Sequence, residues 1–155
     1  MTRWERRYYA VLNAVMRVLL RSPLHGLRSA HTILLVFTGR RSGRRYRMPV
    51  SYWQRGAAEV ICLTSAAWSR WWLNLDGAPV SVVLRGTTYG GRSELVAEPT
   101  LRVELVSGFL RHNAQDCRHY GVDTDAQGRP TAAGLTVLAD APETKVIRIM
   151  LAPGR

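Results

Sequence analysis

The stretch "TGRRSGRRYRMPVSYW", from Thr38 to Trp53, places five arginines within ten residues and then alternates between two kinds of side chain. One side of the alternation is apolar or aromatic, and the other carries arginine, proline and serine, which is typical of a strand with one buried face. The apolar run before it, His31 to Thr38, predicts a buried strand. Two strands joined by a turn rich in glycine and arginine therefore begin the fold, and the charge at that turn needs an explanation.

The rest of the chain predicts a small barrel of about six strands. Further strands are expected at Glu59–Thr64, Val80–Arg85, Tyr89–Ala97 and Lys145–Leu151. Helices are expected at residues 3–21, Ser69–Leu75 and Leu101–His112, and the segment from there to Asp140 predicts irregular structure. Because 155 residues show no repeat or linker, we expect one domain spanning 1–155. The expected fold class is α+β: a mainly antiparallel, closed or partly closed barrel with an N-terminal amphipathic helix and short flanking helices.

Composition favours a globular chain that attracts anions. Hydrophobic residues make up 46% of the sequence, which excludes general disorder, and the formal net charge is +11. Such a field attracts phosphates, carboxylates or anionic lipid. Two cysteines do not make a disulfide framework, and Cys62 lies in the apolar run "VICLT", where a buried free thiol is expected. These features indicate a reducing, cytoplasmic location.

Residues 3–21 have the periodicity of an amphipathic helix that ends before Pro23. One face carries arginines and the opposite face carries Trp4, Tyr8 and valines. Packing on the domain core is the favoured interpretation, and peripheral contact with an anionic membrane surface is the alternative. Asn13 and Arg17 interrupt the apolar segment, so neither a signal peptide nor a membrane-spanning helix is predicted.

The arginine turn has the chemistry of an anion site. Gly39 and Gly43 permit backbone conformations in which main-chain N–H groups converge on an anion, and Ser42 adds a hydroxyl. Arg40 and Arg41 supply bidentate donors, as does Arg47 on the following strand. The turn matches neither a Walker loop nor a dinucleotide fingerprint. The alternative is a solvated hairpin tip without a ligand.

A second constellation, "TSAAWSRWWLNL", gathers Trp68, Trp71 and Trp72 beside Asn74. Tryptophan clusters are either core anchors or walls of aromatic sites, and this element alone favours the core. Helical spacing places Asn74 on the same face as Trp71 and turns Trp72 elsewhere. We therefore expect Trp72 to face the core.

Taken together, "LLVFTGRRSGRRYRMPVSYW", "VICLTSAAWSRWWLNL" and "VSVVLRG" resemble the deazaflavin-dependent nitroreductase family of split β-barrel oxidoreductases. The resemblance covers residues 31–90, about half of the chain with its flanks. It implies a split barrel that binds coenzyme F420, whose tail carries a phosphate and several glutamyl carboxylates, with FMN the less favoured cofactor. It also implies hydride transfer to a quinone, enone or nitro acceptor.

The resemblance also assigns cofactor-binding residues. The residues that match the family's cofactor-binding positions are Arg40, Arg41, Ser42 and Gly43 in the turn, Arg47 and Pro49 under the ring system, Thr64, Ser65 and Ala66 at the strand end, and Trp71 and Asn74 on the short helix. Two departures restrict what can be transferred: the linker "SAAWSR" is short, and Ser51 stands where well-known members carry tyrosine. Some relatives hold other ligands, such as fatty acids, so a binding protein for a lipid or other hydrophobic ligand is the alternative function.

Tyr120 is the candidate general acid for the end of the reduction, with water as the alternative. His112, Cys117 and His119 do not fit a zinc spacing, so no metal site is expected. The expected partner is a small hydrophobic substrate, and a homodimer is compatible with the sequence. A nucleic-acid partner is not expected, because the chain lacks a nucleic-acid-binding signature and its arginines concentrate at one turn.

Overall fold

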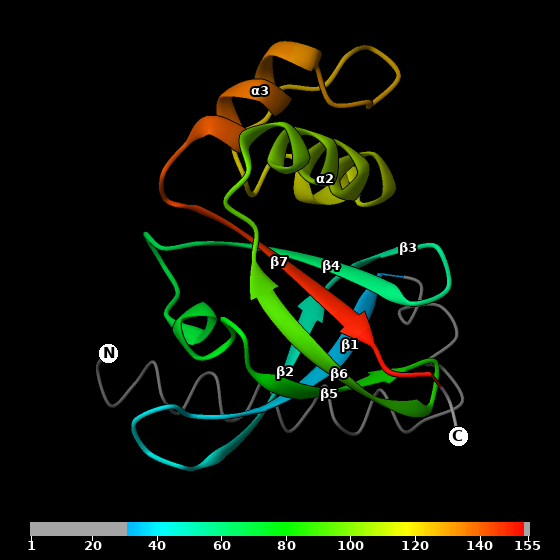
Figure 1. Ribbon diagram of the computed structural model, residues 1–155. Helices are drawn as coiled ribbons and strands as arrows, with labels where there is room; N and C mark the ends of the chain where they lie inside the picture. The colour runs from blue at the N-terminus through cyan, green and yellow to red at the C-terminus, as the bar shows by residue number, and fades with distance from the viewer. Residues whose placement is uncertain (1–30, 154–155) are drawn as a thin grey trace, which may run out of the picture.

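The computed structural model describes residues 31–153, which form one curled antiparallel sheet covered at one end by helices (Figure 1). The strands are β1 (Thr32–Thr38), β2 (Arg45–Ser51), β3 (Trp53–Arg55), β4 (Glu59–Ser65), β5 (Pro79–Leu84), β6 (Thr87–Leu95) and β7 (Thr144–Leu151). The helices are η2 (Trp71–Asn74) and η3 (Ala114–Asp116), which are 3₁₀ turns, and α2 (Pro99–His112) and α3 (Ala132–Asp140). The strand order is β2-β1-β5-β6-β7-β4-β3, with every pair antiparallel.

This strand order explains why the sheet curls. β2 and β3 lie at opposite ends of the order, yet Tyr52 alone separates them in sequence. The two ends of the sheet must therefore meet at Tyr52, whose side chain is buried and whose N–H donates to the carbonyl of His31. β3 pairs only with Glu59–Ile61, so no strand pairs with the remaining edge of β4. The barrel is closed at Tyr52 and split along this edge, and β2 lies across the split from β4.

Two apolar clusters fill the fold. The inner cluster lies inside the curled sheet and includes Ile33, Leu35, Val82 and Ile147. The outer cluster lies between the sheet and the helices, and includes Ile61, Leu63, Leu105, Phe109 and Leu135. Alternate residues of β4 face opposite clusters, as side-chain alternation requires. Burial of both faces explains why the "VICLT" run is apolar without a break, and it places Cys62 fully inside, where burial raises the pKa of its thiol to about 12.

The α+β class and the partly closed antiparallel barrel predicted from the sequence are confirmed. Three details differ. The predicted strand 45–53 is broken at Tyr52, and its continuation as β3 makes seven strands in the described part of the chain. The segment after His112, predicted as irregular, contains η3 and the nine-residue helix α3. Thr131 caps α3 by accepting from the N–H of Gly134, and Leu135 and Ala139 are its buried residues.

The predicted helix at residues 3–21 lies outside the described residues, and so does its proposed membrane contact. Between residues 31 and 153, no helix has the length and hydrophobicity needed to cross a bilayer.

Candidate functional site

The arginine turn is a tight loop between β1 and β2, at the end of the molecule away from α2 and α3 (Figure 1). Gly39 is required by close approach, because a Cβ there would lie 2.5 Å from Ser42 Oγ and 2.7 Å from the ring of Tyr46. Gly43 has φ +65°, a conformation that side chains disfavour. Both glycines thus shape the loop that presents the arginines.

The main-chain donors of the turn are largely used within the protein. The N–H of Gly39 donates to Arg44 O, that of Gly43 to Gly39 O, and that of Arg44 to Ser42 Oγ. The N–H of Arg40 donates to Asn74 Oδ1 at 2.8 Å. The expectation that these N–H groups converge on an anion is therefore wrong for four donors of the loop. An anion at this site would be held mainly by side chains.

The guanidinium groups of the turn, in contrast, have no carboxylate partner within residues 31–153. Among residues 31–153, no carboxylate forms a salt bridge with Arg40, Arg41, Arg44, Arg45 or Arg47, all of which are exposed. The ion pairs in this part of the chain use Arg55, Arg129 and Arg148 instead. Five like charges in one loop repel each other unless an anion neutralises them. The turn has the donor set of a polyanion site.

Asn74 lies beside this turn, and its side chain connects the turn to η2. Asn74 accepts from Arg40 and donates through Nδ2 to Trp71 O at 3.1 Å, so its amide joins η2 to the arginine loop. The Arg40 guanidinium donates to Asp76 O at 2.9 Å and adds a second link. The structure therefore brings Arg40 together with Asn74, thirty-four residues later in sequence, and Asn74 in turn binds the carbonyl of Trp71.

Trp71 and Trp72 are less different than their helical spacing predicted. Both are half-buried and pack against the inner cluster. Trp72 donates through Nε1 to Ser69 O at 3.1 Å, and Lys145 Nζ lies 4.8 Å from the centre of its ring. Trp72 thus contacts the core, but so does Trp71, and η2 buries no residue completely. A 3₁₀ turn is too short to divide its side chains cleanly between core and ligand.

The split between β2 and β4 collects the other predicted cofactor-binding residues. Arg47 and Pro49 lie on β2, on one side of the split, and Thr64 and Ser65 lie at the end of β4, on the other side, with Ala66 directly after them. Thr64 and Ser65 are buried, and Thr64 Oγ1 lies 2.6 Å from Ser69 Oγ. The N–H of Ala66 donates to Glu143 O, so the strand end is firmly placed.

Tyr120 also lies at the split edge. Its hydroxyl donates to the carbonyl of Leu63 at 2.9 Å, and its ring packs against the outer cluster. Burial raises the pKa of this phenol above its ordinary value. The structure thus brings Tyr120 next to Thr64 and gives its proton an acceptor within the protein. Its role as general acid stays a prediction.

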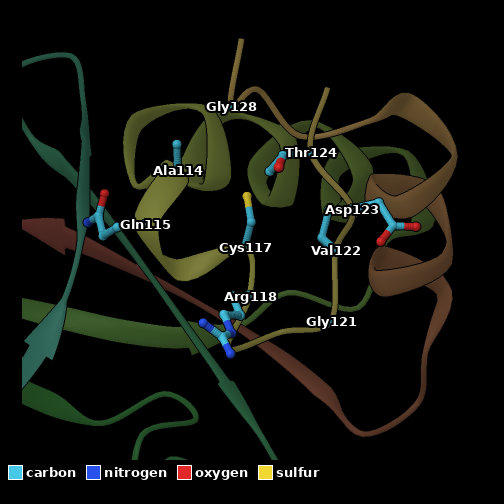
Figure 2. A pocket seen from close by; sticks show the side chains of 9 residues that line it. All are labelled: Ala114, Gln115, Cys117, Arg118, Gly121, Val122, Asp123, Thr124 and Gly128. Carbon is cyan, nitrogen blue, oxygen red and sulfur yellow. The ribbon is translucent and has the colours of Figure 1, made fainter. Parts of the chain in front are cut away.

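A shallow pocket lies elsewhere, in the loops of the helical layer between Ala114 and Gly128 (Figure 2). The sulfur of Cys117 lies between Ala114 and Thr124 in this view. None of the predicted cofactor-binding or catalytic residues lines it. The arginine turn and the split are better candidates for the functional site than this pocket, because the pocket gathers few charged groups. No cluster of His, Cys, Asp or Glu that could hold a metal ion was found within residues 31–153.

The sequence interpretation missed several residues that support the site. Tyr46 places its hydroxyl 3.2 Å from Ser42 Oγ and stacks on Phe37 with ring centres 5.5 Å apart. Ser69 binds both Thr64 and the carbonyl of Ser65. The alternation of β2 already placed Tyr46 on the inner face, so its position could be predicted, but its contact with Ser42 depends on the shape of the turn.

Comparisons with known proteins agree with this fold. No family model and no curated relative matches the chain. Solved structures do match, and three of them are similar over most of their length. HutZ, the heme storage protein from Vibrio cholerae, is 14% identical with a TM-score of 0.52, covering 85% of this chain and 91% of that one. The conserved hypothetical protein Rv2991 from Mycobacterium tuberculosis is 17% identical with a TM-score of 0.55, covering 85% and 81%.

A third similar structure comes from Clostridium acetobutylicum and is described as related to general stress protein 26, of the pyridoxinephosphate oxidase family. It is 10% identical with a TM-score of 0.54, covering 86% of this chain and 83% of that one. The chain therefore shares its fold, a split antiparallel barrel, with these three structures. At these identities the likeness defines the fold class, and function has to be argued from the site.

Proposed function

We propose that this protein is an oxidoreductase that binds reduced coenzyme F420 and transfers a hydride from it to a small organic acceptor such as a quinone, an enone or a nitro compound. The observation that carries the proposal is the group of exposed guanidiniums at the turn, which have no carboxylate partner among the described residues. The tail of F420 carries a phosphate and several carboxylates, and so matches this donor set in charge and number.

The fold supports the proposal at the level of class. One similar structure is described as a member of the pyridoxinephosphate oxidase family and another as a heme storage protein. Binding of a planar cofactor by this protein is consistent with these two descriptions. FMN is the less favoured cofactor, because its single phosphate would leave most of the turn's positive charge without a partner.

The residues present fit F420. Arg40, Arg41 and Arg47 would bind the anionic tail, and the strand end at Thr64–Ala66 would lie beside the ring system across the split. When bound, F420 supplies the hydride, and the protein's own work is to hold the tail, orient the ring and keep water from the acceptor. Asn74 orients the loop that carries Arg40.

Titration of the purified protein with reduced and oxidised F420 and with FMN, followed by tryptophan fluorescence, tests the proposal. The Arg40→Ala and Arg41→Ala double variant should bind F420 at least about a hundredfold more weakly, since each charge-assisted contact contributes about 1.5–3 kcal/mol. The matched control is Arg111→Ala with Arg118→Ala, two exposed arginines of the helical layer. It removes the same charge, and its affinity should change little.

Equal losses in the two double variants would show that only net charge matters and would remove the turn from the site. Failure of the wild-type protein to bind F420, together with a co-purified lipid, would replace the proposal with the hydrophobic-ligand alternative.

A further inference from the structure

Three aromatic rings meet beside the end of β4, outside the arginine turn. Trp68, in the turn after β4, lies with its ring centre 4.8 Å from that of His119 in an edge-to-face arrangement. Tyr120 lies 5.9 Å from Trp68 and 5.2 Å from His119. Two segments about fifty residues apart in sequence thus contribute to one cluster.

The cluster is exposed and yet firmly held. Trp68 is 51% exposed, and His119 is also exposed. The turn that carries Trp68 is attached to Ser65 by three hydrogen bonds, from the N–H groups of Ala67, Trp68 and Ser69. On the other side, the Tyr120 hydroxyl is bound to Leu63. Both segments are therefore anchored to the same end of β4.

A fixed and half-exposed tryptophan is well suited to binding a ligand. It presents a large apolar face whose position is already determined, so little conformational entropy is lost when a ring stacks on it. Its packing in the protein does not use this face completely, as its exposure shows. His119 adds a ring N–H donor at the edge of the same surface.

This surface adjoins the residues assigned to the cofactor ring, since Trp68 follows Ala66 by two positions and binds the carbonyl of Ser65. The apolar face of Trp68, with the N–H donor of His119 at its edge, matches a planar ring that carries a carbonyl oxygen. Flexible lipids match it less well.

We propose that Trp68 and His119 form the acceptor-binding surface: the indole of Trp68 stacks on a planar cyclic carbonyl compound of the quinone class, and His119 donates a hydrogen bond to its oxygen. The proposal rests on the proposed function for its redox meaning. Tyr120 packs against both rings and is itself held by the carbonyl of Leu63.

Equilibrium dialysis without cofactor tests the surface directly, with menadione and 2-methylnaphthalene as probes. The two share a bicyclic skeleton, but only menadione has carbonyl oxygens. Trp68→Ala should weaken the binding of both by about tenfold, because both stack on the indole. His119→Ala should weaken menadione alone, by about fivefold, and His119→Gln should restore part of that loss through its amide N–H. Trp68→Phe, which keeps a ring, should change both by less than about threefold.

Leu73→Ala is the matched control, because Leu73 is 46% exposed and lies on η2. It should bind both probes like the wild type. Unchanged menadione binding in Trp68→Ala and Trp68→Phe would overturn the stacking role. Equal weakening of both probes by His119→Ala would overturn the hydrogen bond.

F420 titration of the same variants separates this proposal from the proposed function. Trp68→Ala and His119→Ala should bind F420 with wild-type affinity. If the wild-type protein binds menadione but not F420, the proposed acceptor surface is supported and the proposed cofactor is rejected. Loss of F420 affinity in both variants would assign these residues to the cofactor and overturn the acceptor surface.

Discussion

Arg102 and the arginines of the turn carry the same side chain in opposite circumstances. Arg102, on α2, donates to four main-chain carbonyls: Ala139 and Ala141 at the end of α3, Val96 after β6, and Thr144 in β7. Its guanidinium joins two helices to the sheet. Of the turn arginines, only Arg40 has a side-chain hydrogen bond among the described residues, to Asp76 O.

The difference shows how structural and ligand-binding arginines can be told apart. A guanidinium has five N–H donors, and one whose donors are taken by protein carbonyls has little left for a ligand. Arg55 and Arg148 resemble Arg102 in this respect, because both are bound to glutamates within the fold. Among residues 31–153, Arg41, Arg44, Arg45 and Arg47 make no such side-chain hydrogen bond, which is the state that an anion site requires before it binds.

The largest expected effect is on Arg102. Arg102→Met keeps the apolar stem but leaves four carbonyls without this donor, so the free energy of unfolding should fall by about 3 kcal/mol. Urea denaturation followed by tryptophan fluorescence measures the change. Arg111→Met, an exposed position on the same helix, is the control and should stay within about 0.5 kcal/mol. Equal stability of the two variants would remove the distinction between the two kinds of arginine.

A smaller effect is expected at the link between η2 and the turn. Asn74→Ala removes the acceptor for the Arg40 N–H, so stability should fall by about 1 kcal/mol. The affinity for F420 should fall about tenfold, because the loop that carries the guanidiniums is less well ordered. Gln54→Ala, whose amide makes one long hydrogen bond of 3.4 Å, is the control and should change neither quantity. If Asn74→Ala binds F420 with wild-type affinity, η2 does not contribute to the site.

Glu98 is a carboxylate whose hydrogen-bond partners, like those of Arg102, are main-chain groups of the protein. Glu98 caps α2 by accepting from the N–H groups of Leu101 and Thr100, and these hydrogen bonds hold the pKa of its carboxyl below the ordinary value. A lowered folded-state pKa stabilises the protein above the ordinary pKa, and that contribution is lost as pH falls through the lowered value. Glu98→Gln should therefore lower the melting temperature slightly at neutral pH and converge with the wild type as the pH falls through the lowered pKa of Glu98. A difference that does not depend on pH would assign the effect to packing.

The smallest effect is expected at Arg41. Because Arg41 is exposed among like charges, Arg41→Gln should leave stability within about 0.5 kcal/mol of the wild type or raise it slightly at low salt. The gain should disappear in concentrated salt, which screens the repulsion. Thermal unfolding at two ionic strengths measures it. A marked destabilisation would mean that Arg41 has a structural partner, like Arg102.

The sequence was sufficient for features that depend on local pattern. Alternation along β2 placed Met48 and Val50 on the inner face, and both pack against the inner cluster. The glycines at 39 and 43 predicted the tight turn. The spacing of Trp71 and Asn74 predicted one shared helical face, and this stays a prediction, because the Asn74 side chain binds only the main-chain carbonyl of Trp71.

Features that depend on distant segments could not be predicted in this way. Arg102 has the pattern of a solvated helix position, and its carbonyl partners lie up to forty-two residues away. The helix α3 follows a loop that contains Gly128 and Pro130. The helix itself contains a glycine and a threonine, which weaken its helical signal in the sequence. The break at Tyr52 follows from the closure of the barrel, because an unbroken alternation gives no sign that β2 and β3 belong to opposite ends of the sheet.

The position of β7 has a consequence for how the chain folds. β7 follows the other six described strands in sequence but lies between β6 and β4 in the sheet. Until residues 144–151 have been synthesised, β2-β1-β5-β6 and β4-β3 share no strand-to-strand hydrogen bonds through the sheet. Folding of the barrel on the ribosome must therefore wait until β7 has emerged from the exit tunnel. A chain that stops before Thr144 would expose two unpaired strand edges, which are sites for aggregation.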